Sequence, residues 1–295
     1  MILELKGIYK EYQQGKMKVP VLKNVDFSME EGEYVAIMGP SGSGKTTLMN
    51  IIGCLDKQTE GTFFLDGVDI KACSENEMSD LRLNKIGFVF QSFHLLPKQS
   101  ALANVEMPLN YARVPKKERR ERALKALDRV GLADRVDFKP NQLSGGQKQL
   151  LNLAATMVMG PEILILDEPT AQLDPIAAEN FLGTLKKIND ELGITVILSE
   201  HRLDNVLAYG NKVIVMDSGK IQYCGEPYKI LEHNIDEDVL KLMPMATRIY
   251  YESGMEGADE KTPISISDGR RWLERLVYSG CNALFLFSYT QIQYD

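Results

Sequence analysis

Residues 39–46 read GPSGSGKT and have the residue types and spacing of a phosphate-binding loop. Glycines let such a loop curl so that several N–H groups point inward, and the helix that follows adds the positive end of its dipole. Lys45 would then reach the β- and γ-phosphates, and the hydroxyl of Thr46 would bind Mg²⁺. The residues expected to hold the nucleotide here are Gly39, Pro40, Ser41, Gly42, Ser43, Gly44, Lys45, Thr46 and Thr47. The segment therefore predicts binding of a nucleoside triphosphate.

Residues 163–170 read ILILDEPT, an apolar run that ends abruptly in two carboxylates. Parallel α/β sheets bind ligands at the ends of their strands, so Asp167 and Glu168 should emerge beside the phosphates. Neighbouring residues of a strand point in opposite directions, so the two acids should have different roles. We expect Asp167 to bind Mg²⁺ and Glu168 to orient or deprotonate the attacking water.

The elements that position these residues are predicted from hydrophobic patterns. Apolar runs of the length of buried strands alternate with helical patterns, and they lie at 34–38, 86–90, 163–166, 195–198 and 213–216. After the first run, Leu48, Ile51, Ile52 and Leu55 have the spacing of a helix with one apolar face. We therefore expect the α/β fold of a P-loop NTPase, with a largely parallel sheet and an inserted α-helical subdomain.

The predicted domain organisation follows from changes in composition along the chain. Strand-like runs disappear between the second and third apolar runs, where prolines interrupt polar helical patterns, so the helical subdomain should span about 92–150. Past residue 225 the sequence becomes rich in tyrosine and acidic residues, so we expect an ATPase domain over 1–230 and a C-terminal extension over 231–295. A short helix opening at Ser267 or Asp268 should bury Trp272, Leu273, Leu276 and Val277.

Composition and charge exclude several classes of protein. The 295 residues are 44% hydrophobic and 25% charged, which fits a folded chain and excludes a disordered or fibrous one. The net charge of −7 argues against a general nucleic-acid binder, because phosphate affinity rests on Lys and Arg. The four cysteines have no metal-ligand or redox spacing, as expected for the cytoplasm. No stretch approaches the roughly 18 apolar residues of a membrane helix, so any membrane role should go through a partner.

With both motifs in place, residues 143–147, LSGGQ, make the chain resemble the ATP-binding subunits of ABC transporters over roughly residues 2–230. The resemblance implies that the nucleotide is ATP and that a signature of four residues closes on the ATP of an opposite subunit. These four residues are Ser144, Gly145, Gly146 and Gln147. A serine and two glycines ahead of a helix form another anion-binding site, in agreement with that role. The resemblance thus implies a head-to-tail dimer, homomeric or heteromeric, around two ATP molecules. It also implies an N-terminal antiparallel β part in the fold.

Further residues match functional positions of this family. Gln91 matches the glutamine that contacts Mg²⁺ and the attacking water and links the site to the helical subdomain, and His201 matches the histidine that senses the γ-phosphate. Asp174 matches the aspartate that couples the two sites, and Tyr12 the aromatic residue that stacks on adenine, with Tyr9 as a competitor. The resemblance therefore implies catalysis by Glu168, His201, Lys45 and Gln91, and Mg²⁺ binding by Thr46, Gln91 and Asp167.

The resemblance changes along the chain. Up to about residue 147, segments such as NIIGCLD and IGFVFQSFHLLP look like the ATPases of MacB- and LolD-type machines, which drive lipoprotein release or export. From about residue 148, PEILILDEPTAQLDP and SEHRLDNVL look like energy-coupling-factor ATPases of the CbiO type, which power vitamin and metal uptake. Leu150 replaces the usual arginine, and Ala171 and Gln172 stand where a serine and a small residue are common. A mosaic of two related subunits and an unusual lineage both explain this pattern.

The sequence favours an ATPase subunit that powers a membrane permease from the cytoplasmic face of the membrane. The helical subdomain contacts the permease in this family and belongs to the exporter-like half, so a MacB- or LolD-like role is preferred over energy-coupling-factor uptake. An ABC ATPase acting on DNA or ribosomes is disfavoured because the interval between phosphate loop and signature has no room for a long heptad insertion. A non-hydrolysing regulatory module is disfavoured because Glu168 and His201 are both present.

Overall fold

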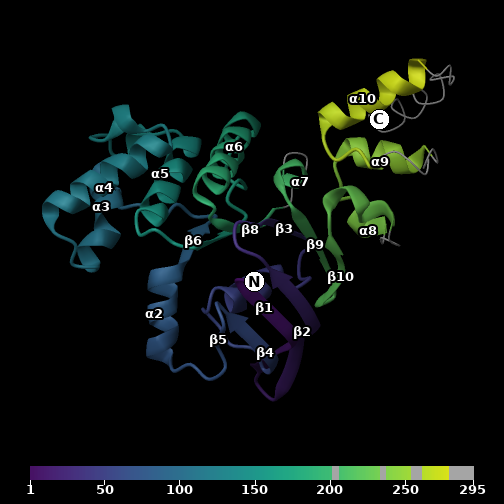
Figure 1. Cartoon of the computed structure of the whole chain (residues 1–295), viewed down its shortest axis with the longest axis horizontal. Helices are drawn as coiled ribbons and strands as arrows, with labels where there is room; N and C mark the ends of the chain where they lie inside the picture. The colour runs from purple at the N-terminus through teal and green to yellow at the C-terminus, as the bar shows by residue number, and fades with distance from the viewer. Residues whose placement is uncertain (201–205, 233–236, 254–260, 279–295) are drawn as a thin grey trace.

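The computed structural model describes residues 1–200, 206–232, 237–253 and 261–278. Its larger sheet comprises β3 (Tyr34–Met38), β6 (Ile86–Phe90), β7 (Ile163–Asp167), β8 (Thr195–Ser199), β9 (Lys212–Asp217) and β10 (Lys220–Gly225). The strand order is β10-β9-β3-β8-β7-β6, and every pairing is parallel except that of β9 with β10 (Figure 1). Each strand predicted from an apolar run is present, which confirms the α/β fold with a largely parallel sheet.

The central strands are apolar along their whole length because both faces of the sheet are covered. In β3, Tyr34, Ala36 and Met38 belong to one buried hydrophobic cluster, whereas Val35 and Ile37 belong to the other. Successive side chains of a strand point to opposite faces, so a strand between two clusters has no position for a polar residue. The sheet is therefore a rigid support whose polar residues gather at the strand ends.

The register of the strands brings their carboxyl ends to one edge of the sheet. Phe90, the last residue of β6, pairs with Asp167, and Asp167 pairs with Ser199 at the end of β8. Ser199 also pairs with Ile37 of β3, which leads into the phosphate loop at Gly39. Ligands of parallel α/β sheets bind at this edge.

The smaller sheet is antiparallel and contains the N-terminal strands. Its members are β1 (Leu3–Gln14), β2 (Met17–Met29), β4 (Glu60–Leu65) and β5 (Val68–Asp69), in the order β2-β1-β4-β5. All its pairings are antiparallel, which confirms the predicted N-terminal β part. Alternate residues of β1, such as Leu3 and Leu5, are buried, so this sheet has one covered face.

The helix after the phosphate loop, α1 (Lys45–Ile52), is shorter than its apolar spacing predicts. Leu48, Ile51 and Ile52 are buried as expected, but Leu55 is 47% exposed and lies beyond the helix. The chain leaves the helix at Gly53, and Cys54 adopts a left-handed backbone with φ +54°. The prediction that Leu55 belongs to the apolar face is therefore wrong, because the helix ends before that residue.

A helical subdomain is inserted between β6 and β7. After α2 (Glu75–Lys85), which precedes β6, the inserted helices are α3 (Ala101–Tyr111), α4 (Lys116–Arg129) and α5 (Gly145–Met157), with short turns at Ala133–Arg135 and Pro140–Gln142. Figure 1 shows α3, α4 and α5 together at one end of the molecule. Helix α5 continues toward the sheet and buries Leu151, Leu153 and Ala154 in the core, and Leu150 packs against the same cluster. The predicted inserted subdomain is confirmed, and α5 joins it to the core.

The remaining elements complete the core and the C-terminal extension. They are α6 (Pro175–Leu192), α7 (Val206–Tyr209), a turn at Pro227–Glu232, α8 (Glu237–Leu240), α9 (Met245–Glu252) and α10 (Ile266–Tyr278). Helices α8, α9 and α10 lie at the end opposite to α3–α5 (Figure 1). None of the helices in the described parts of the chain is long and apolar enough to cross a membrane.

The C-terminal helix α10 only partly matches its predicted packing. It begins at Ile266, and Trp272 is buried edge-on against Tyr250 of α9, with ring centroids 5.3 Å apart. Leu273, however, is 39% exposed, so the prediction that it is buried is wrong. Helix α9 packs against the side of α10 that carries Trp272 and buries this side chain. Leu273, the next residue, lies outside this contact and remains exposed. Leu276 is half-buried, and the side chain of Val277 lies outside the described residues.

Candidate active site

The phosphate loop places Lys45 against its own backbone at the carboxyl edge of the large sheet. The ammonium Nζ donates hydrogen bonds to the carbonyl oxygens of Gly39 at 2.8 Å and Pro40 at 3.0 Å. Burial lowers the pKa of Lys45, and the negative charges of Glu168 and Asp167 oppose this shift. The structure thus brings together the three charged residues that the sequence placed at one site.

Two glycines of the loop occupy positions that no other residue fits. Gly39 has φ +148°, and a Cβ there would lie 2.1 Å from the carbonyl oxygen of Met216 in β9. Gly44 has φ +103°, and its Cβ would lie 2.8 Å from a methyl group of Leu22 in β2. Close contact with backbone and a left-handed conformation both require glycine. The loop is therefore held in its curled shape by strands on either side.

Ser43 gives direct evidence that the loop is built for a polar ligand. Its side chain is buried, and its Oγ has no hydrogen-bond partner among the described residues. An unsatisfied buried hydroxyl destabilises a fold by about 1–3 kcal/mol, so such a group usually has a functional reason. A phosphate oxygen is a strong acceptor that would satisfy this donor.

Ser199 connects the carboxylate of Asp167 to the backbone of Glu168 at the edge of the sheet, and sequence reasoning missed it. Its Oγ donates to Oδ1 of Asp167 at 2.5 Å, and its carbonyl oxygen accepts from the backbone N–H of Glu168 at 3.1 Å. Glu168 has φ +47°, a left-handed backbone that is unusual for a residue with a side chain. Strained backbone of this kind persists where surrounding contacts determine it, and it is frequent at active sites. The available signal was the position of Ser199 at the end of the strand next to β7.

The loop that follows Glu168 is held by a second residue that the sequence did not reveal. Glu200 is buried, and its Oε1 accepts a hydrogen bond from the backbone N–H of Thr170 at 2.8 Å. His201, the residue expected to sense the γ-phosphate, lies outside the described residues. Gln91 is exposed and directly follows Phe90, whose partner in β7 is Asp167. The strand pairing therefore places Gln91 at the same edge as the two acids.

The four signature residues form the N-terminus of α5. Ser144 caps the helix by accepting from the N–H of Gln147 at 3.2 Å, and Oε1 of Gln147 accepts from the N–H of Ser144 at 3.0 Å. This reciprocal capping box fixes the start of the helix, whose N-terminus is the positive end of its dipole. Such a helix start suits the anion-binding role that the sequence predicts for the signature.

Asp174 lies at the start of α6, next to the signature. It caps α6 by accepting from the N–H of Ala177 at 2.9 Å. A Cβ added to Gly146 would lie 2.9 Å from Cβ of Ala177, so the starts of α5 and α6 touch. In the described part of the chain, no hydrogen bond or ion pair joins residues 144–147 to the phosphate loop. The phosphate loop and the signature are therefore two separate candidate sites of one chain.

Tyr12 in β1 is held beside the phosphate loop by a polar network. Its hydroxyl donates to Oδ2 of Asp56 at 2.7 Å, and the ammonium of Lys10 lies 4.8 Å from the centre of its ring. Burial and the hydrogen bond to Asp56 raise the pKa of Tyr12, and a hydrogen bond with Thr47 opposes the shift. The contact with Thr47 places Tyr12 next to the helix that follows the loop.

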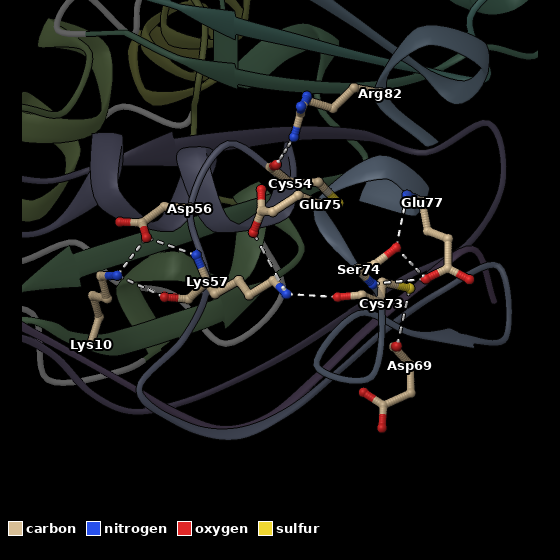
Figure 2. A network of polar contacts seen from close by, with 10 residues as sticks. All are labelled: Lys10, Cys54, Asp56, Lys57, Asp69, Cys73, Ser74, Glu75, Glu77 and Arg82. Carbon is tan, nitrogen blue, oxygen red and sulfur yellow. Dashed lines mark hydrogen bonds and ion pairs between the residues drawn. The ribbon is translucent and has the colours of Figure 1, made fainter. Parts of the chain in front are cut away.

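Figure 2 shows how Asp56 is anchored in this network. Lys10 donates to Oδ1 of Asp56 at 2.5 Å and to the carbonyl oxygen of Lys57 at 2.7 Å. Burial alone would raise the pKa of Asp56, but hydrogen bonds from Lys10 and Tyr12 hold it below its usual value. Lys57 extends the network to the start of α2 through the carbonyl oxygen of Cys73 at 2.7 Å and Glu75 at 3.9 Å (Figure 2). The Tyr12 side of the site is therefore rigidly supported.

Comparison with known protein families gives one match that covers half of the chain. The family described as "ABC transporter" matches residues 22–171. An uncharacterised ABC transporter ATP-binding protein of Bacillus subtilis, YvrO, is 48% identical over 216 residues, which cover 73% of this chain and 94% of YvrO. The macrolide export ATP-binding/permease protein MacB of a Shewanella strain is 41% identical over 82% of this chain, which spans 37% of MacB.

Solved structures of other ATP-binding proteins have a similar fold. The ATP-binding cassette MJ0796, described as a dimer in a post-hydrolysis state with ADP and Pi, aligns with a TM-score of 0.69 at 41% identity. That alignment covers 76% of this chain and 98% of the cassette. CbiO1 of Clostridium perfringens, described as part of the transporter complex CbiONQ, aligns with a TM-score of 0.72 at 32% identity, over 81% of this chain and 93% of CbiO1. Both groups named from the sequence, the MacB type and the CbiO type, are therefore among the relatives.

Proposed function

Because the chain belongs to the ABC transporter family, as one of its ATP-binding and ATP-hydrolysing subunits, we propose that it powers a membrane permease of the MacB or LolD type. The observation that carries this proposal is the convergence of Lys45, Asp167 and Glu168 at the carboxyl edge of the large sheet. The identity to MacB, whose name records macrolide export and a permease, supports an export or lipoprotein-release machine. The whole process, including its substrate, belongs to the assembled transporter.

The donor set at the edge of the sheet suits Mg²⁺. Thr46, Asp167 and Gln91 offer a hydroxyl, a carboxylate and an amide oxygen, which are the hard oxygen ligands that Mg²⁺ prefers. In the described residues no cluster of three or more His, Cys, Asp or Glu side chains gathers to hold a metal by itself, as expected for an ion held jointly with phosphate. Bound Mg²⁺ would neutralise charge on the transferred phosphoryl group.

The chain's own residues explain how hydrolysis proceeds. Lys45 and the loop N–H groups bind the β- and γ-phosphates, while Ser199 fixes the carboxylate of Asp167 through its 2.5 Å hydrogen bond. Glu168 orients and deprotonates the attacking water, because its carboxylate lies at the same edge. His201, as in the family, is proposed to hold the γ-phosphate. Positioning and charge stabilisation together supply most of the catalysis of phosphoryl transfer.

A second cassette completes the site. Since the phosphate loop and the signature are separate candidate sites in one chain, each ATP is proposed to bridge the loop of one chain and the signature of another. The dimeric MJ0796 structure at 41% identity favours a second copy of this chain, with a related chain as the alternative. After hydrolysis the two phosphate-containing products are held by different chains, so the bridge is lost and the pair reopens.

The permease is proposed to dock where Gln91 meets the helical subdomain, at the cytoplasmic face of the membrane. Phe90, which precedes Gln91, is 40% exposed and stacks on Phe88 with ring centroids 5.6 Å apart. His94 packs edge-on against Phe90 at 5.7 Å. An exposed aromatic cluster beside a catalytic residue is suited to coupling a partner to the site.

We further propose that residues 1–230 form the ATPase domain, with its helical subdomain at about 92–150, and that residues 231–295 are an extension. The alignment with MJ0796 supports this division, because it covers 98% of that cassette but 76% of this chain. The position of α8–α10 at one end of the molecule agrees with it (Figure 1).

Replacing Tyr12 with Ala should raise the KM for ATP by about 5- to 100-fold, because stacking of a base on an aromatic ring is worth about 1–3 kcal/mol. Tyr12→Phe should stay near the wild type, since the ring remains. Tyr9→Ala is the matched control, because Tyr9 is a tyrosine of the same strand with 38% exposure against 40% for Tyr12. A KM for Tyr12→Ala near that of the wild type, or a larger rise of KM for Tyr9→Ala, would show that Tyr12 does not bind adenine.

The transporter class is tested by capture of the permease. Tagged Glu168→Gln protein, bound to ATP in detergent-solubilised membranes, should co-purify with a permease of the MacB or LolD type, identified by mass spectrometry. Lys45→Ala protein at an ATP concentration that just saturates the Glu168→Gln protein is the control, because its weaker affinity should leave it mostly free of ATP. Recovery of an energy-coupling transmembrane subunit would instead show that the chain powers an importer. An importer ATPase is the second candidate function, and the likeness of the chain to CbiO1 favours it.

A further inference from the structure

Gln149 is a buried polar residue of α5 that none of the sequence motifs explains. Its side chain is fully buried, and its amide Nε2 donates to the carbonyl oxygen of Pro169 at 2.8 Å and to that of Phe90 at 3.3 Å. Its Oε1 accepts from Nδ2 of Asn152 at 3.5 Å. An amide NH₂ has two hydrogens, so one nitrogen serves both carbonyl groups.

The two carbonyl groups belong to the loops that carry the catalytic residues. Pro169 directly follows Glu168, and Phe90 directly precedes Gln91. These residues come from neighbouring strands, since Phe90 pairs with Asp167. Gln149 therefore fixes the backbone next to the proposed base and next to the glutamine proposed to contact Mg²⁺ and the attacking water. A buried amide with both donors in use is costly to move, so this connection is stiff.

Gln149 also lies on the helix that begins with the signature. Ser144 caps α5 little more than one helical turn before Gln149, and α5 is continuous through Met157. A displacement or rotation of the start of α5 is thereby transmitted to Gln149, because a helix moves as a rigid rod. The start of α5 also lies against α6 at Ala177 and against Leu173 in the loop after Glu168, but Gln149 is the residue of α5 that binds the backbone on both sides of the site.

We propose that Gln149 is a positioning residue that aligns Glu168 and Gln91 of its own chain when the signature of that chain closes on the other chain's ATP. The proposal rests on the proposed dimeric ATPase. It explains how ATP bound in one site prepares the other site. When the signature binds the other chain's ATP, the position of α5 is fixed, and Gln149 then holds Pro169 and Phe90 in place. Displacing a catalytic group by about 1 Å can lower a rate by 10²-fold, so a residue of this kind controls kcat without touching the substrate.

Gln149→Met tests the proposal, because Met has a similar length and no donor. We expect kcat for ATP hydrolysis to fall by about 10- to 100-fold, with the KM for ATP within about threefold of the wild type, because the phosphate loop is not altered. Gln149→Glu, which keeps the shape but turns an acceptor toward the two carbonyl groups, should lower kcat at least as much.

Thr156→Val is the matched control, since Thr156 also lies on α5 and its Oγ donates to a carbonyl of β6, that of Phe88, at 3.2 Å. It should lower the melting temperature by an amount similar to Gln149→Met and leave kcat within about twofold. A Gln149→Met enzyme with normal kcat, or a loss of kcat equal to that of Thr156→Val, would overturn the proposal. If the wild-type protein itself releases no phosphate from ATP, the proposed function fails rather than this inference.

Discussion

Replacing Glu168 with Gln should lower the rate of phosphate release from ATP by about 10²- to 10⁴-fold, the range that general base catalysis contributes. Glutamine has the shape of glutamate but no basic carboxylate, so water is no longer deprotonated. ATP affinity should be retained, because we propose that the loop around Lys45, and not Glu168, holds the phosphates. The rate is measured as phosphate release by purified protein with Mg²⁺ and saturating ATP.

The matched control for this variant is Glu162→Gln. Glu162 lies just before the amino end of β7, the same strand that ends beside Glu168, and it forms an ion pair with Lys85 at 3.0 Å. Partly exposed ion pairs contribute little to stability, so this variant should fold and hydrolyse ATP within about twofold of the wild-type rate. If Glu168→Gln kept the wild-type rate, Glu168 would not be the base, and the roles assigned to the two carboxylates would be wrong.

Replacing Lys45 with Ala should weaken the binding of ATP and slow its hydrolysis. Hydrogen bonds to charged groups contribute about 1.5–3 kcal/mol, so the affinity for ATP should fall by about 10- to 100-fold. Hydrolysis at saturating ATP should fall by about 10²- to 10³-fold, as for loss of one group that stabilises charge in the transition state. Binding is measured by isothermal titration, which separates it from the effect on the rate.

Lys57→Ala serves as the control for removal of a lysine close to α1. Its ammonium binds the carbonyl oxygen of Cys73 and Glu75 in the network at the start of α2 (Figure 2). We expect its ATP affinity to stay within about threefold of the wild type, because a partly exposed pair of this kind is worth about 1 kcal/mol or less. Similar losses in the two variants would mean that Lys45 acts on the fold and not on the phosphates.

The parts of the site that lie within one continuous motif could be predicted from the sequence. Gly39, Lys45, Asp167 and Glu168 occur in segments whose spacing is set by the phosphate loop and by the end of a strand. The structure brings Lys45 near both acids because the register of a parallel sheet aligns the carboxyl ends of its strands. Such residues are recognisable because local geometry alone dictates their types.

The sequence does not single out the supporting residues, because their partners are distant in sequence. Ser199 contacts Asp167, Glu200 contacts Thr170, and the two acceptors of Gln149 are Phe90 and Pro169, so every contact joins segments far apart along the chain. A buried Ser, Glu or Gln has no periodicity that distinguishes it from a surface residue.

The two wrong predictions about helix residues, for Leu55 and Leu273, have a related cause. Leu55 follows a helix that ends at Gly53, where a Cβ would lie 2.0 Å from the ring of Phe88. Leu273 lies on a helix whose neighbour covers only one side. Apolar spacing predicts which face of a helix prefers to be buried, but tertiary contacts decide where the helix ends and how much of that face is covered.

The central claim is that ATP joins two cassettes across a site that one chain cannot complete. The most direct test is the mass of the Glu168→Gln protein by size exclusion with light scattering, with ATP and with ADP. We expect the mass to be twice the 33.2 kDa of one chain with ATP and 33.2 kDa with ADP. A mass that stays at 33.2 kDa while ATP is bound would contradict the account.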